Sequence, residues 1–357
     1  MSFRETLDRW FHEPTVPLLD VFILDPARPD KLQAGRHYVR VRVVRMHLKY
    51  ESTWLQEWMP AVQSHVRFDA GNLNVEIPNL ADAKRANLQA DKKAGLLVIK
   101  NVPLTPTVPF HGGVLELSAS LLAIKGANRL NDFVGVLGGF AEVLQVPQFT
   151  AALAVAQPLI KGMDVLLDVA NDHIHLGYFN SYRAGELSDG HILVVRSPAA
   201  DTDPDQFVVV QDTLHVRDPG APGGTRAYVE CDHMLLRVEV FEERDDWEML
   251  TLISEPWAEV QQVMSEQAAD WEKTAAMKFR LVLLRVAQAK ELTKNDRIRI
   301  GNELTTQYKL MKQQDGAYLV EDVPPTFRQL ASRASSRSIA ATAREPTIEE
   351  WFANLDD

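Results

Sequence analysis

Alternation of apolar and polar residues with a period of two is the feature that most limits how this chain can fold. Within residues 114–124, apolar residues occupy alternate positions from Leu115 to Leu121, with glutamate and serine between them. Because successive side chains of a strand point to opposite faces, this pattern predicts a half-buried β-strand. Similar stretches, separated by turn residues, fill residues 17–125 and return in residues 173–242. We therefore expect an α+β chain in which these two blocks form one antiparallel β-sandwich; two separate β units are the alternative.

The stretch Tyr38–Tyr50 is the longest strand candidate. Its apolar residues keep one phase as far as Val43 and shift by one residue from Val44 onward. A β-bulge at this point would explain the shift, because a bulge adds one residue to one strand of a pair. Residues 36–49 contain five basic residues and no acid, whereas residues 230–248 are mostly acidic, which predicts cross-strand ion pairs. A basic face that meets anionic lipid or an acidic partner is the alternative.

Two regions depart from the strand pattern. Residues 127–170 are apolar at helical spacing and are interrupted at Val146-Pro147, which predicts a helical hairpin inserted between the β blocks. We expect the hairpin to be buried, because charged residues at the centre of a bilayer are costly; membrane entry is the alternative. The polar stretch Asn79–Lys93 predicts a short surface helix.

From Pro256 onward the sequence becomes helical. Three helices are predicted, at Trp257–Asp270, Trp271–Ala289 and Lys294–Met311, and Thr293 is the expected N-cap of the third. The second helix is apolar on most of its surface, which is typical of a buried helix. Its apolar residues are Met277, Phe279, Leu281, Leu283, Leu284 and Val286.

The expected organisation has four parts. An amphipathic helix in residues 1–16 precedes the β-sandwich in residues 17–256, which contains the hairpin. A helical region in residues 257–327 is followed by a tail in residues 328–357 that ends in a short amphipathic helix. Residues 328–345 contain few large apolar side chains, so they cannot bury enough surface to offset the entropy of ordering. We expect them to be flexible.

The two ends of the sequence resemble each other: TLDRWF begins at Thr6 and TIEEWF begins at Thr347. Each has a capping-box signal and an aliphatic residue three positions before its Trp, which predicts a short amphipathic helix. A Trp-Phe anchor on such a helix suits a groove on another protein. Packing of both helices on their own domain is the alternative. The candidate partner-binding residues are Trp10, Phe11, Ile348, Trp351 and Phe352.

The acidic residues that follow Ala200 have part of the spacing of a calcium loop. They occupy the first, third, fifth and twelfth positions of such a loop. However, Gln206 stands where a calcium loop has glycine, and the flanking residues are typical of strands rather than helices. We favour a solvated turn over a metal site. The calcium candidates are Asp201, Asp203, Asp205 and Asp212.

Three other groups have part of the composition of a catalytic or metal site. His173 and His175 share one face of a predicted strand, but spacing fixes no third ligand. Cys231 and His233 are also two residues apart, without a nucleophile elbow or an oxyanion glycine pattern, and Ser188–His191 lacks the same features. We therefore predict no catalytic residue, no resident metal and no cofactor.

Composition limits the partners and the compartment. There are 38 Lys and Arg residues against 49 Asp and Glu, a net charge of -11, which disfavours nucleic-acid binding. The single cysteine, Cys231, excludes an internal disulfide framework. The sequence starts without the apolar core of a secretory signal and has no uncharged apolar stretch long enough for a membrane span. By elimination, we expect a cytoplasmic protein.

These features favour a non-catalytic protein-binding or adaptor protein. In this hypothesis the sandwich surface and a tethered Trp351-Phe352 helix contact another protein or a second copy of the chain. One alternative is a substrate or effector regulated by proteolysis, since Arg333, Arg337 and Arg344 lie in the tail. A C2-like membrane-binding module is a second alternative, by analogy of fold only. An enzyme assembled from scattered His and Asp residues is a third, although no small-molecule substrate is identified.

Overall fold

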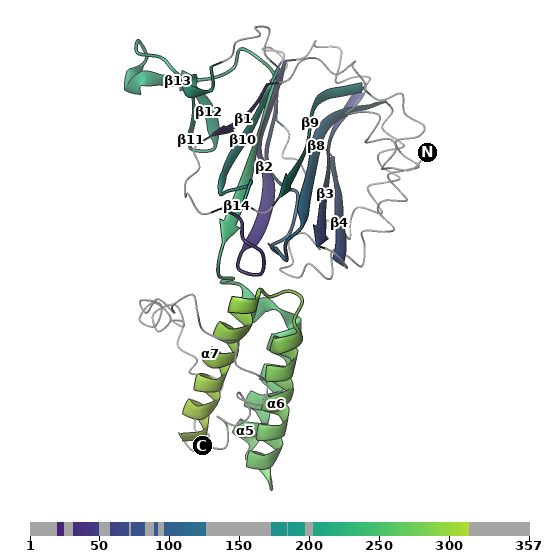
Figure 1. Cartoon of the computed structure of the whole chain (residues 1–357), viewed down its shortest axis with the longest axis vertical. Coiled ribbons are helices and arrows are strands. Elements are labelled where there is room, and N and C mark those ends of the chain that lie inside the picture. The colour runs from purple at the N-terminus through teal and green to yellow at the C-terminus, as the bar shows by residue number, and fades with distance from the viewer. Residues whose placement is uncertain are drawn as a thin grey trace. The chain divides into compact units, whose positions relative to one another are not determined.

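The computed structural model divides the chain into two compact units, Met1–Phe241 and Glu242–Asp357. The described part of the first unit consists of β-strands and short turns, and that of the second contains three α-helices (Figure 1). All the sheets in the described part are antiparallel, so the chain combines antiparallel sheets with helices, as expected. The structure describes residues 20–24, 31–49, 58–70, 73–82, 89–91, 96–125, 173–183, 185–196 and 203–313. The predicted hairpin in residues 127–170 lies outside them.

A seven-stranded sheet combines strands from both sequence blocks. The order along it is β1-β10-β14-β2-β6-β5, and β7 also pairs with β2. Strands from the second block lie between β1 and β2, so the two blocks do not form separate β units. The strands are β1 (Asp20–Leu24), β2 (Tyr38–Lys49), β5 (Gln89–Asp91), β6 (Leu96–Pro103), β7 (Val108–Pro109), β10 (Gly190–Val195) and β14 (His233–Phe241).

β2 contains the predicted β-bulge. The register between β2 and β14 shifts between Leu235, which pairs with Arg45, and Leu236, which pairs with Val43. Val44 is therefore the extra residue, at the position where the apolar phase of the sequence changes. The prediction of a bulge at this point is confirmed.

The two faces of the β2–β14 pair differ in polarity. On one face Val41 lies opposite Val238, and both side chains are buried. On the other face the Nε of Arg40 donates to Oε2 of Glu239 at 2.6 Å. The predicted cross-strand ion pairing of the basic and acidic stretches is thus confirmed at this position.

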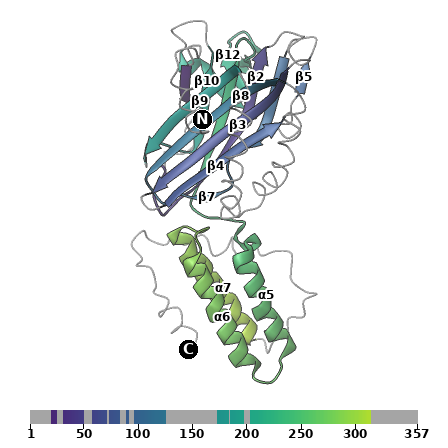
Figure 2. The ribbon, with the colours of Figure 1, turned by 90° about the vertical axis from the view of Figure 1, so that its right-hand side faces the viewer.

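A second, four-stranded sheet has the order β4-β3-β8-β9. One of its faces is apolar and buried, with Val66 opposite Leu117 and Phe68 opposite Leu115. Figures 1 and 2 show this sheet beside the seven-stranded sheet, with the strands of one drawn in front of those of the other in the second view. Its strands are β3 (Trp58–Ala70), β4 (Leu73–Asp82), β8 (Val114–Lys125) and β9 (His173–Arg183).

The surface helix predicted for Asn79–Lys93 is wrong in the described part of that stretch. Residues 79–82 complete β4, which pairs with β3 along its whole length, and β5 occupies Gln89–Asp91. Local composition allowed a helix here, but the backbone groups of the neighbouring strands supplied hydrogen bonds that the composition could not reveal. Strand pairing therefore overrode a weak intrinsic helix preference.

A small three-stranded sheet packs on the seven-stranded sheet. Its strands are β11 (Phe207–Val210), β12 (Thr213–Arg217) and β13 (Thr225–Ala227). Phe207 and Leu214 are buried in one cluster with Leu193 and Leu235 of the larger sheet. The turn between β11 and β12 has positive φ at both Gln211 and Asp212, the geometry of a two-residue type I′ hairpin.

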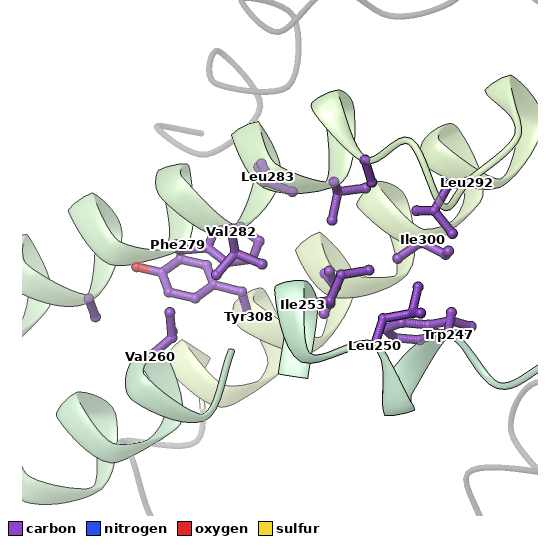
Figure 3. Close-up of a cluster of buried hydrophobic side chains, with 14 of the residues drawn as sticks. Trp247, Leu250, Ile253, Val260, Phe279, Val282, Leu283, Leu292, Ile300 and Tyr308 are labelled. Atoms are coloured by element: carbon purple, nitrogen blue, oxygen red, sulfur yellow. The ribbon is translucent and has the colours of Figure 1, made fainter. Parts of the chain in front are cut away.

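The second unit is a bundle of α5 (Thr251–Glu266), α6 (Trp271–Gln288) and α7 (Lys294–Gln313) around an apolar core (Figure 3). In that core the ring of Phe279 stacks on that of Tyr308, with centroids 4.4 Å apart. The predicted N-cap is present, because the Asp296 amide donates to Oγ1 of Thr293 at 3.3 Å. The predicted second and third helices agree with α6 and α7 to within two residues.

The first helix starts earlier than predicted. α5 begins at Thr251 rather than Trp257, and Pro256 lies inside it. The Ser254 amide donates to the Leu250 carbonyl at 2.8 Å, so a helical turn forms before the proline. Leu250 and Ile253 are buried in the core of the bundle. Their burial offsets the hydrogen bond that a proline nitrogen cannot donate.

Candidate functional site

The predicted partner-binding and protease-sensitive residues lie outside the described residues, as does one calcium candidate. They therefore stay predictions. The residues concerned are Trp10, Phe11, Ile348, Trp351, Phe352, Arg333, Arg337, Arg344 and Asp201.

The other calcium candidates take part in local contacts. Oδ1 of Asp203 accepts a hydrogen bond from the Asp205 amide at 3.0 Å and caps a single 3₁₀ turn. The Asp212 carboxylate lies 3.6 Å from the guanidinium of Arg42. Among the described residues, no three or more His, Cys, Asp or Glu side chains are grouped in a way that would hold a metal ion. A calcium site that includes Asp201 stays a prediction.

His233, two residues after Cys231, belongs to a buried pair of imidazole rings. His233 stacks on His47, the residue opposite it on β2, with ring centroids 4.9 Å apart. Nδ1 of His233 is 3.1 Å from the carbonyl oxygen of Cys231, so this contact involves the backbone and not the thiol. Burial lowers the pKa of His233 to about 3; the Cys231 carbonyl opposes this shift, and His47 and Arg45 add to it. His233 is therefore neutral at pH 7.

The histidine pair belongs to a packed aromatic cluster. The ring of Tyr228 lies 5.6 Å from that of His233 and meets Phe207 edge-on at 5.2 Å. Burial raises the pKa of Tyr228, and its hydrogen bond with the Cys231 side chain raises it further. Neutral rings in contact with the small sheet indicate a structural role for the Cys231–His233 pair.

The remaining histidine and aspartate candidates lie in strands or next to them. His173 and His175 lie on β9, as predicted. Asp189 forms an ion pair with Arg237, and its Oδ2 accepts a hydrogen bond from the Val240 amide at 3.1 Å. The Ser188–His191 segment thus connects the start of β10 to β14.

Helix α6 exposes apolar side chains that we expected to be buried. Met277 and Leu281 are 60% and 52% exposed, so the prediction that they are buried is wrong. The two residues are four positions apart and lie on the same side of the helix. Phe279, Val282 and Leu283 lie in the core instead (Figure 3). α6 is apolar on two sides, and its neighbours α5 and α7 cover only one of them.

We call Met277, Leu281 and the half-buried Leu284 the outer stripe of α6. Basic residues border it. Residues 273–288 include four Lys or Arg and no Asp or Glu, in a chain whose net charge is -11. This local run of positive charge is the signal in the sequence that marks the exposed side of the helix. The basic residues are Lys273, Lys278, Arg280 and Arg285.

The border on the α7 side includes a groove of about 590 Å³. Its walls include three basic residues, Lys273, Arg280 and Lys312, and also the acidic Asp270 and Glu272. On the α5 side, Nζ of Lys278 donates to the Glu259 carboxylate at 2.6 Å.

The outer stripe is an apolar surface with basic residues on both sides, one of which, Lys278, is paired with Glu259. Long apolar side chains exposed together mark interaction surfaces, because covering them removes apolar area from water. The positive borders favour a segment that carries its own apolar residues on one side and carboxylates beside them. The arrangement suits the binding of a helix.

Comparisons with known proteins leave the function to be argued from the chain itself. No family model, no curated protein and no solved structure matches it. Of the helices in the described residues, none is long and apolar enough to cross a bilayer.

Proposed function

We propose that this chain is a non-catalytic protein-binding or adaptor protein, and that the outer stripe of α6 is one of its docking surfaces. The observation that supports this proposal is the exposure of Met277 and Leu281 on a helix whose opposite side is buried. Covering such side chains contributes on the order of 1–2 kcal/mol each, which makes them suitable anchors for a partner.

The basic residues beside the stripe indicate that its partner is acidic. The stripe is bordered by four basic residues, so an acidic amphipathic helix is the ligand that best complements it. Apolar contacts would supply most of the affinity. The Lys and Arg side chains would orient the helix and accelerate its association, as charges at the rim of an interface do.

In the same proposal, the two larger sheets form the layers of a β-sandwich. Their apolar faces support this arrangement: Val41 and Val238 are buried on one sheet, and Val66 and Leu117 on the other. Two sheets with one apolar face each bury both faces when they stack. The sandwich would offer a second surface for contacts with a protein. We propose the cytoplasm as the compartment, where a lone cysteine stays reduced.

A labelled peptide tests the docking surface. The probe is PTIEEWFANLDD, the sequence of residues 346–357, titrated by fluorescence anisotropy into the full-length chain that carries Trp351→Ala and Phe352→Ala. These two substitutions prevent the chain's own motif from competing. We expect saturable binding that is about tenfold weaker, or more, when Met277→Asp and Leu281→Asp are added.

A matched control uses another exposed Met and Leu of the same unit. Met249 and Leu310 are 66% and 51% exposed, and Met249→Asp with Leu310→Asp should leave peptide binding unchanged. Equal loss in both double variants, or no binding to the parent chain, would contradict the proposal. A peptide of the same composition, with its apolar residues spread around the helix, should bind at least about tenfold more weakly.

Anionic lipid is the competing ligand for an apolar stripe with basic borders. Sedimentation with phosphatidylserine vesicles separates the two cases. We expect the full-length chain to stay in the supernatant. Pelleting that is abolished by the Met277 and Leu281 substitutions, without peptide binding, would replace the proposal with membrane binding.

A further inference from the structure

The chain contains a segment that matches its own docking surface. We propose that residues 347–357 bind to the outer stripe of α6 within the same molecule, so that the chain covers this surface until a partner displaces the segment. This inference rests on the proposed function, because it assigns an occupant to the same surface.

The apolar residues of the segment have the spacing that such a contact requires. Four of them recur three or four positions apart and would line one side of a helix. The outer stripe has the matching spacing on α6, where its residues also lie four and three positions apart. Two helices with such rows can pack side by side. The residues of the segment are Ile348, Trp351, Phe352 and Leu355.

The charge of residues 347–357 makes them a better ligand for the stripe than the similar sequence that begins at Thr6. Residues 347–357 contain four acidic residues and no Lys or Arg, whereas residues 273–288 contain four basic residues and no acid. In the N-terminal copy, Asp8 and Arg9 stand side by side and cancel. Only the C-terminal copy therefore complements the border of the stripe. Its acidic residues are Glu349, Glu350, Asp356 and Asp357.

The covalent connection is long enough for the contact. α7 ends at Gln313, so roughly 30 residues separate it from Thr347, and a chain of that length spans up to about 100 Å when extended. The 18 residues of α6 rise only about 27 Å. A ligand joined to its receptor in this way has an effective concentration of about a millimolar, so even a modest intrinsic affinity gives high occupancy.

Amide hydrogen exchange on the full-length wild-type chain tests the contact. We expect residues 348–355 to exchange about tenfold more slowly, or more, than in the variant M277D/L281D. The control variant M249D/L310D should retain the wild-type protection. Equal exchange in all three chains would overturn the inference.

Charge reversal provides a second test that does not remove an apolar group. Glu349→Lys with Glu350→Lys should raise exchange in the segment, and adding Lys273→Glu with Arg280→Glu should restore protection. A purely structural effect of the α6 substitutions would not produce this rescue. Failure of the fourfold variant to recover any protection, when the E349K/E350K chain has lost it, would contradict the assigned surface.

Competition separates failure of this inference from failure of the proposed function. The labelled 346–357 peptide should bind the W351A/F352A chain about fivefold more tightly, or more, than the wild type, because the wild-type segment competes. Equal tight binding by both chains would refute self-occupancy and leave the docking surface intact. No binding to either chain would refute both. Protection that increases with protein concentration would assign the contact to a second copy and overturn the intramolecular inference.

Discussion

Two features of the helical unit break the usual separation of apolar interior and charged surface, and they do so in opposite directions. Arg244 has a fully buried side chain, whereas Met277 and Leu281 are exposed on α6. Charged side chains are almost never buried without partners, and exposed apolar patches often mark interaction sites. A buried cation requires acceptors or carboxylates around it, and an exposed apolar surface requires a partner that covers it.

The partners of the buried Arg244 side chain come from the segments that flank the helices. Nε of Arg244 donates to Asp246 at 2.5 Å, and its Nη1 donates to the Glu291 carbonyl at 3.4 Å. Its amide donates to Asp296, whose other carboxylate oxygen accepts from Arg299 at 2.7 Å. These contacts connect the segment before α5 to the start of α7, so the exception is structural. For the outer stripe we propose the acidic segment at residues 347–357 as the complement, and we propose that this exception is functional.

The largest effect is expected from removal of the buried cation. Arg244→Met removes the cation that pairs with Asp246 and with the buried carboxylate of Glu291, which should lower the free energy of unfolding by about 3–5 kcal/mol. Urea denaturation followed by circular dichroism measures this change. The control Arg226→Met, at an exposed ion pair with Glu230, should have little effect. Similar stabilities for the two variants would mean that the Arg244 network is not structural.

The two sides of α6 should respond differently to truncation. Phe279→Ala removes a ring that stacks on Tyr308 in the core and should cost about 3–4 kcal/mol through the cavity it leaves. Leu281→Ala lies on the exposed side and should change the free energy of unfolding by less than about 0.5 kcal/mol. The same denaturation curves test both. A large loss for Leu281→Ala would show that the outer stripe is part of the core.

His233 is another buried polar group, and unlike Arg244 it is neutral at pH 7. The unfolded histidine has a pKa of about 6.5, and the folded one a pKa of about 3. Between these values the unfolded state binds more protons, so stability falls as the pH decreases through this window. Lowering the pH from about 7.5 to about 5 should cost about 2 kcal/mol from this residue.

Chemical denaturation at the two pH values measures the effect, and His233→Gln should remove most of it. The control His215→Gln, on β12, should keep the pH dependence of the wild type. An H233Q chain that loses as much stability on acidification as the wild type would assign the dependence to other groups. His47, Arg45 and Glu230 are the charged or titratable neighbours that a reassignment would consider first.

The smallest effect is expected from the exposed ion pair of β2 and β14. Arg40 and Glu239 are 47% and 20% exposed, so solvent screens their attraction. A double-mutant cycle with Arg40→Ala and Glu239→Ala should give a coupling free energy of about 0.2–1 kcal/mol, decreasing with added salt. A coupling above about 2 kcal/mol would show that this pair resembles the Arg244 network more than a surface contact.

Features that depend on the local sequence were predictable. The change of apolar phase at Val44 located the bulge, because a one-residue insertion shifts every following side chain to the other face. Thr293 was identifiable as an N-cap because its side chain bonds to an amide three residues later. The charges of β2 and β14 identified them as candidates for pairing.

Features that depend on residues far away in the sequence were not predictable from it. The helix tolerance of Asn79–Lys93 did not reveal that β3 would pair with residues 73–82. The start of α5 before Pro256 depends on the burial of Leu250 by the rest of the bundle. The exposure of Met277 could not be read from the apolar composition of α6, because a helix that is apolar on two sides does not indicate how many neighbours will cover it.

Methyl NMR of the nine methionines tests the central claim most directly. If residues 347–357 lie on the outer stripe, the aromatic rings of Trp351 and Phe352 should shift the Met277 methyl signal of the wild-type chain upfield. That signal should move to the position of a solvent-exposed methionine in W351A/F352A, while the signal of Met249 stays in place. A Met277 signal at the solvent-exposed position in both chains would contradict the account.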